Sequence, residues 1–289
     1  MTGGPLSTGR LAQVACLLEA TARKPGNVHR FRDFADAHYL DFLLSAAAVA
    51  GPLDRAAEAG VGRAILESVE ATRRLVATNT NLGIILLLAP LAAVPPGVPL
   101  RSGVEEVLKA STVEDATLAY RGVRLAEPGG LGRSPEGQDV DDEPTVTLVE
   151  AMTLAAGRDL VARQYASGFA DVFDRSAPAL RESLRAGRPL ETAIIAAFLA
   201  SLAEAPDTLI ARKRGESTAL EASARALSVL GAGWPDHPEG VAALADFDAW
   251  LRLDGHARNP GATADLTTAA LFAALRDGTI PLPIKNGDF

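Results

Sequence analysis

The segment LGIILLLAPLAAV, residues 82–94, is the most apolar stretch of this 289-residue chain. It is too short to cross a bilayer as a helix, which takes about 20 residues. A helix that is apolar on all sides is instead typical of a protein core. We therefore expect a buried central helix here.

Apolar residues also recur at helical spacing on both sides of this segment. The stripes begin at Leu11, Leu40, Val61, Thr192 and Leu220. Alternating apolar runs bounded by turns, which indicate strands, are nearly absent. The chain is rich in alanine and leucine, which favour helices, and only 5% of its residues are aromatic. The pattern predicts an all-α protein of about ten or more helices.

Local signals mark some helix boundaries. Ser102 with Glu105, and Thr112 with Asp115, have the spacing of a capping box, in which a hydroxyl and a later acid cap a helix start. The main break is residues 127–144, with four glycines, three prolines and six acids against one base. It predicts a loop of about 18 residues. Because helical patterning resumes beyond this acidic loop, we expect one all-helical domain over residues 1–289.

Composition excludes several classes of protein. The chain is 48% hydrophobic and 22% charged, which is typical of a globular protein and not of a disordered one. Its net charge of −8 argues against a general nucleic-acid binder. A single cysteine excludes an internal disulfide framework and fits a reducing cytoplasm. We expect no nucleic-acid or membrane partner.

Three short segments combine turn residues with polar side chains. Residues 21–32 hold four basic residues and no acid, which indicates either an anion site or a solvated turn facing the end of a helix. Residues 79–83, NTNLG, are either a helix cap or a phosphate-binding helix start. Residues 256–265, HARNPGATAD, offer the same two readings.

The acids of the long loop are a candidate metal site. Asp139, Asp141 and Asp142 lie close together in the sequence without histidine or cysteine. Clustered carboxylates suit Mg²⁺, which usually takes one or two of them together with substrate phosphates. The alternative is a solvated acidic loop.

Taken in order, these segments resemble the triphosphoribosyl-dephospho-CoA synthase family. The family has a glutamate followed by Lys-Pro-Gly-Leu-Val-Asp, and this chain has Glu19 followed by KPGNVH at residues 24–29. Four further family motifs are similar to FADAH with Phe42 and Ser45, NTNLG, DTLI with Arg212, and NPGATADL, which begin at Phe34, Asn79, Asp207 and Asn259. The resemblance runs from about residue 19 to about residue 272.

The chain departs from the family inside these motifs. Its His29 replaces an aspartate, Phe34 replaces a histidine, and His38 replaces a second aspartate. Asn81 and Leu82 replace a His-Lys pair. The departures suggest a divergent member that keeps the nucleotide site and uses another acceptor.

The resemblance implies transfer between ATP and 3′-dephospho-CoA. A ribose 2′-hydroxyl attacks C1′ of the ribose of ATP, adenine leaves, and the triphosphate stays attached. Transfer at an anomeric carbon needs a carboxylate near the sugar and a proton donor near adenine. The triphosphate needs cations, including Mg²⁺.

Residues of this chain match those needs as hypotheses. Lys24, Arg212 and Lys213 would hold phosphates, and Asn27, Asn79, Asn81, Asn259 and Gly261 would bind polar groups of the substrates. Asp36, Asp207 and Asp265 are candidates for the base or for Mg²⁺ ligands, His29 for the proton donor, and Asp139, Asp141 and Asp142 for a second metal group.

Two other classes stay open. One is a helical Mg²⁺-dependent hydrolase, which would release product from one substrate alone. The other is a non-catalytic helical binding module, which would bind no nucleotide. A homodimer is compatible with either class and with the transferase.

Overall fold

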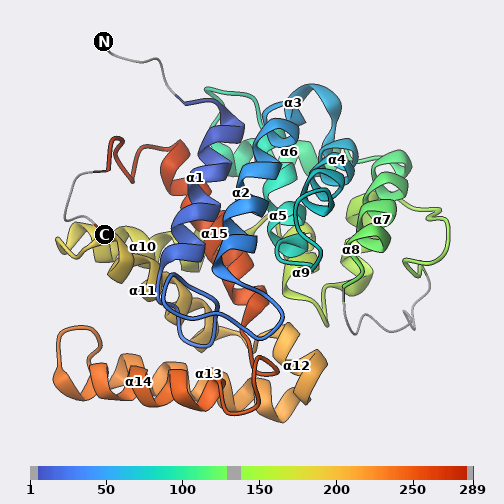
Figure 1. The fold of residues 1–289 in the computed structure, drawn as a ribbon. Coiled ribbons are helices and arrows are strands. Elements are labelled where there is room, and N and C mark those ends of the chain that lie inside the picture. The colour runs from blue at the N-terminus through green and yellow to red at the C-terminus, as the bar shows by residue number, and fades with distance from the viewer. Residues whose placement is uncertain (1–5, 129–137, 285–288) are drawn as a thin grey trace.

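Two buried helices, α5 (Leu82–Ala93) and α15 (Gly261–Arg276), form the centre of the fold (Figure 1). Every residue of α5 except Gly83 is buried, which confirms the expected core helix. In α15, thirteen of the sixteen residues are buried. The two helices pack against each other, and most of the other helices contact one or both of them. A helix that is apolar on all sides needs such cover on all sides.

A computed structural model describes residues 6–128, 138–284 and 289. In these residues the chain forms fifteen α-helices and one π-helical turn, so the all-α prediction is confirmed. No strand occurs in this part of the chain, where the β-type pairing is one isolated bridge between His29 and Arg32. The other helices are α1 (Thr8–Thr21), α2 (Tyr39–Asp54), α3 (Ala56–Ala59), α4 (Val61–Arg73), α6 (Leu100–Lys109), α7 (Val113–Ala126), α8 (Leu148–Ala155), α9 (Leu160–Ser167), α10 (Ala177–Arg185), α11 (Leu190–Glu204), α12 (Thr208–Arg214), α13 (Glu216–Gly231) and α14 (Pro238–Leu251), and the π-helical turn is Val172–Ser176.

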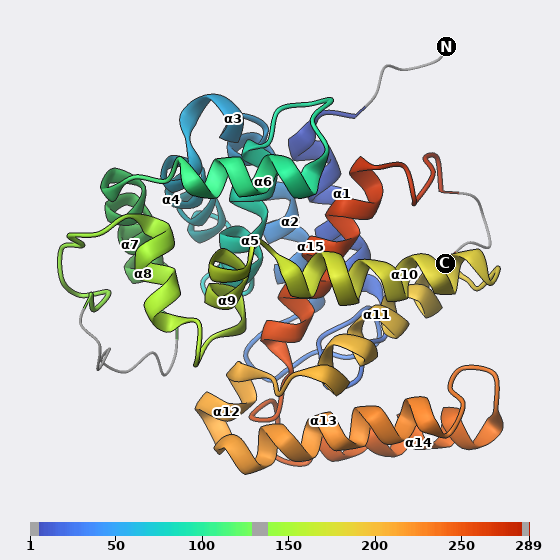
Figure 2. The ribbon, with the colours of Figure 1, turned by 180° about the vertical axis from the view of Figure 1, so that it is seen from behind.

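Two hydrophobic clusters hold the helices together. The larger one surrounds α5 and α15 and includes residues of α1, α2, α4 and α7. The smaller one joins α11 and α12 to the hairpin of α13 and α14, which lies along one side of the molecule in both views (Figures 1 and 2). The single-domain organisation stays a prediction.

One of the two predicted capping boxes is present. Thr112 Oγ1 accepts from Asp115 N at 3.0 Å, and Asp115 accepts from Thr112 N at 2.9 Å. The prediction at Ser102 is wrong, because α6 begins at Leu100 after Pro99. The fixed φ of proline suits a helix start, so Ser102 lies inside the helix and donates to Pro99 O at 3.3 Å.

Within the described ranges no single helix is both long and apolar enough to cross a membrane. Helices α11 and α12 pass that test only as a pair, and they are bent by 58° where they meet.

Candidate functional site

A cavity of about 1060 Å³ opens where four helices begin and two loops meet. The first residues of α5, α9, α12 and α15 line it, together with parts of residues 27–37 and with residues 127–128 and 138–140. The amide ends of helices carry partial positive charge, so a cavity at several of them favours anionic ligands. Ten of the residues predicted from sequence lie in its wall: Asn27, Asp36, Asn79, Asn81, Asp139, Arg212, Lys213, Asn259, Gly261 and Asp265.

Asp265 is the most strongly perturbed of these ten residues. Its carboxylate lies against Gly83 in the first turn of α5, where a Cβ would come within 2.5 Å of Asp265 Cγ. Burial, followed by the charges of Glu19, Asp207 and Asp159, raises the pKa of Asp265 well above its usual range, although Arg212 opposes this. Among the described residues it has no hydrogen-bond or ion-pair partner. The surroundings of Asp265 therefore favour the protonated carboxyl group.

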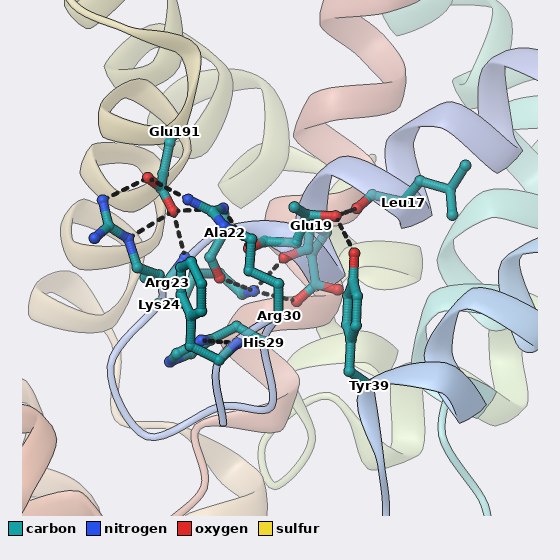
Figure 3. Close-up of polar contacts among 11 residues, drawn as sticks. Leu17, Glu19, Ala22, Arg23, Lys24, His29, Arg30, Tyr39 and Glu191 are labelled. Atoms are coloured by element: carbon teal, nitrogen blue, oxygen red, sulfur yellow. Dashed lines mark hydrogen bonds and ion pairs between the residues drawn. The ribbon is translucent and has the colours of Figure 1, made fainter. Parts of the chain in front are cut away.

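A second carboxylate, Glu19 on α1, also lines the cavity and is held by Lys24. Lys24 Nζ lies 2.9 Å from Glu19 Oε1, and the two side chains are 0% and 5% exposed (Figure 3). The same ammonium donates to the carbonyls of Glu19 and Ala22. Lys24 itself does not line the cavity. The ammonium thus has three protein acceptors, and the phosphate-binding role of Lys24 stays a prediction that its place outside the cavity wall does not support.

His29 also lies away from the cavity. Its Nδ1 accepts a hydrogen bond from Phe31 N at 3.3 Å. Burial lowers the pKa of His29 to about 4, and the charges of Arg252 and Lys24 contribute to this shift. At neutral pH the imidazole is uncharged and outside the cavity, so it does not fit the predicted role of proton donor.

The Asp207 carboxylate connects the starts of two helices by hydrogen bonds. Its Oδ1 accepts from Leu209 N at 2.9 Å and Ile210 N at 3.1 Å, at the start of α12. Its Oδ2 accepts from N and Oγ1 of Thr263, at 2.7 and 2.8 Å, at the start of α15. The carboxylate is fully buried, and burial raises its pKa despite these hydrogen bonds. Asp207 thus positions the cavity wall, and it does not line the cavity as a base or metal ligand would.

Three of the predicted asparagines differ in their hydrogen bonds. Asn79 Oδ1 accepts from Leu82 N at 3.2 Å and so caps α5, and Asn81 Nδ2 donates to Thr72 Oγ1 at 3.2 Å. Asn259 Oδ1 is buried and has no hydrogen-bond partner in the part of the chain that the structure describes. A buried amide oxygen without a partner is costly, and a ligand donor in the cavity would satisfy it.

Two cations of α12 and a pair of stacked rings also line the cavity. They are Arg212, Lys213, Phe34 and His256. Arg212 is 3.6 Å from Asp159, the N-cap of α9, and burial lowers the pKa of Lys213. The rings of Phe34 and His256 stack at 5.0 Å with an interplanar angle of 27°. Asp36 Oδ1 lies 3.5 Å from His256 Nδ1, which places Asp36 as a partner of that histidine.

The three loop aspartates do not form one metal site. Asp139 lines the cavity and accepts from Asp141 N at 3.0 Å in a tight turn. That turn leaves Asp141 and Asp142 exposed and outside the cavity wall. In the described parts of the chain, no three His, Cys, Asp or Glu side chains converge as a metal-binding group. Residues 129–137 of the predicted loop lie outside the described residues.

Sequence reasoning missed three functional candidates. Glu19 was part of a motif but received no role, and its spacing from Lys24 was the available signal. His256 opens the third polar segment, whose two readings rest on the turn and on the helix start and give the histidine no role. Phe34 was noted as a departure, and nothing in the sequence pairs it with His256.

The fold and the cavity define a class: a helical protein with a nucleotide-sized cavity whose wall holds cations and the carboxyl groups of Glu19 and Asp265. The sequence profile of the CitG family, described as ATP:dephospho-CoA triphosphoribosyl transferase, matches residues 5–282. The chain belongs to this family and is a transferase-family enzyme.

A solved structure supports the same fold. A protein from Archaeoglobus fulgidus, named as a candidate triphosphoribosyl-dephospho-CoA synthase, superimposes with a TM-score of 0.63 at 24% identity. The match covers 82% of this chain and 99% of that one. No curated protein matches this chain in sequence.

Proposed function

We propose that this chain transfers the triphosphoribosyl group of ATP to the ribose 2′-hydroxyl of 3′-dephospho-CoA or a similar acceptor, with release of adenine. The observation that carries the proposal is the cavity of about 1060 Å³, which gathers segments from all five family motifs. This volume lies just above the usual range for small-molecule sites, about 300–1000 Å³.

The triphosphate fits the wall formed by α12 and the starts of α5 and α15. Arg212 and Lys213 supply cations there, and both line the cavity. Partial loss of water lowers the pKa of Lys213, although the residue as a whole is exposed. An anionic ligand would favour its charged form.

The purine base fits the stack of Phe34 and His256. Both rings line the cavity, and aromatic side chains bind bases through their faces. Asp36 orients the imidazole ring of His256 from the rim. The unpartnered oxygen of Asn259 offers an acceptor for an amino or hydroxyl group of a substrate.

The described residues offer no dedicated Mg²⁺ cage, because no three candidate ligands converge. We propose that Mg²⁺ enters with the triphosphate, whose oxygens supply most of the ligands, as is usual for this ion. A homodimer also stays a prediction, which a measurement of molecular mass in solution would check.

Product identity tests the proposal. The protein is incubated with ATP, Mg²⁺ and 3′-dephospho-CoA, and mass spectrometry follows free adenine and the triphosphoribosyl adduct. We expect both products in equal amounts. Arg212→Ala should raise the KM for ATP. Arg185→Ala, at an exposed residue of α10 outside the cavity wall, should leave that KM unchanged. Absence of adenine with dephospho-CoA and with related acceptors would overturn the proposal.

A further inference from the structure

Glu19 and Asp265 are two carboxyl groups that face one cavity in opposite electrostatic environments. Glu19 is paired with the fully buried ammonium of Lys24 at 2.9 Å. Asp265 has no cation within ion-pair distance among the described residues and lies against the backbone at Gly83. Two carboxyl groups whose environments differ in this way are typical of an acid and base pair.

The neighbours of Asp265 reinforce this difference. The acids Glu19, Asp207 and Asp159 face it from α1, α12 and α9, and Arg212 is the one cation among the groups that shift its pKa. Cys16 lies one turn before Glu19 on α1. Burial, and then the charges of Glu19 and Asp265, raise the pKa of its thiol, which therefore adds no charge beside the two carboxyl groups. Asp265 therefore lies in an acidic environment that disfavours a further negative charge.

We propose, on the basis of the transferase function above, that Asp265 is the acid that protonates the departing adenine and Glu19 is the base that accepts the proton of the attacking hydroxyl. Lys24 is a positioning residue, because it acts only through Glu19. The bond from O2′ of the acceptor to C1′ forms, and the bond from C1′ to N9 breaks with its electron pair going to adenine. Adenine takes the proton of Asp265 and leaves neutral. After release, Glu19 returns one proton to solvent and Asp265 regains one.

The assignment separates two needs of the reaction that one carboxylate cannot meet. A purine anion is a poor leaving group, so the acid must already carry its proton at working pH. The attacking hydroxyl needs a base that is already ionised. Neither His29 nor Asp207 meets these needs, since neither lines the cavity.

A leaving group that needs no acid tests the roles. In 7-methyladenosine triphosphate the base already carries a positive charge, so it departs without protonation. Asp265→Asn should lower kcat with ATP by about 100-fold or more. With the methylated substrate and dephospho-CoA, the same variant should come within about tenfold of wild type. Glu19→Gln should lose activity with both substrates, after subtraction of the enzyme-free reaction.

The wild-type protein provides a second test that needs no folded variant. With ATP, kcat/KM should fall at high pH as Asp265 loses its proton, and with the methylated substrate this fall should disappear. Lys24→Met should lower kcat with both substrates alike, as Glu19→Gln does, because it removes the cation that holds the Glu19 carboxylate in place. Lys109→Met, at an exposed ion pair, is the matched control.

Equal losses of Asp265→Asn with both substrates, or a high-pH fall that persists with the methylated substrate, would overturn the inference. Failure of the wild-type protein to release adenine from ATP with dephospho-CoA would instead overturn the proposed function.

Discussion

Asp207 joins the starts of α12 and α15, because its Oδ2 accepts from both N and Oγ1 of Thr263 at 2.7 and 2.8 Å. The segments that contain these residues are 56 positions apart, yet both line one cavity. The buried Asp207 carboxylate, with its four donors, thus holds together the part of the cavity wall that carries Arg212 and Asp265.

Removal of the Asp207 carboxylate should destabilise the protein. Asp207→Ala leaves four buried donors without their acceptor, and we expect the free energy of unfolding to fall by about 2–4 kcal/mol. Urea denaturation measures the change. Asp159→Ala, which uncaps only α9, should cost about 1 kcal/mol. Equal costs for the two variants would contradict the bracing role.

Gly83 should be required for the position of Asp265. In Gly83→Ala the new methyl group would meet the carboxyl group of Asp265, so we expect a large loss of kcat. Gly51→Ala is the control, because its Cβ would have no neighbour nearer than Arg55 Nη1 at 3.8 Å. That substitution should leave activity unchanged and stabilise the helix by about 0.5–1 kcal/mol. Steady-state kinetics and thermal melting of both variants check this, and full activity of Gly83→Ala would contradict it.

Phe34 should contribute to binding of an adenine base. Phe34→Leu keeps an apolar side chain but removes the stacking face, and calorimetry should show about fivefold weaker binding, equivalent to about 1 kcal/mol. ATP and dephospho-CoA are titrated separately, so the affected ligand identifies which adenine stacks there. Phe31→Leu, at an exposed ring outside the cavity, is the control. The role is refuted where neither ligand binds more weakly than in the control.

Low pH should weaken the ion pairs by which Glu191 of α11 holds Arg23 and Arg30, in the segment that follows α1. Burial would raise the pKa of Glu191, but hydrogen bonds from Arg23 and Arg30 outweigh it and lower the pKa to about 2 (Figure 3). Because the folded pKa lies below the unfolded value of about 4.3, this contribution is present above that value. It is lost as pH falls toward 2. In Glu191→Gln, unfolding free energies measured by urea denaturation should depend less on pH between about 5 and 2, and an unchanged slope would count against the ion pairs.

Sequence predicted the fold well because the signals for helices are local. The uniformly apolar residues 82–94 and the capping box at Thr112 each follow from a few neighbouring residues. The failed cap at Ser102 shows the limit of such reasoning, since Pro99, three residues earlier, starts the helix.

The candidate site was predicted as a set of segments but not as a set of contacts. A charged residue in a motif looks the same in the sequence whether it faces a ligand or a neighbour. Lys24 turned toward Glu19, and Asp207 toward Thr263, because each buried charge requires partners that only the folded chain supplies. The stack of Phe34 on His256 joins residues 222 positions apart, which no local pattern encodes.

Adenine release with and without acceptor tests the central claim most directly. The protein is given ATP and Mg²⁺ alone, then the same mixture with 3′-dephospho-CoA, and adenine is quantified over time. A triphosphoribosyl transferase releases adenine only in the second mixture, one molecule for each adduct formed. Adenine released from ATP alone at the same rate would identify a hydrolase and contradict the account.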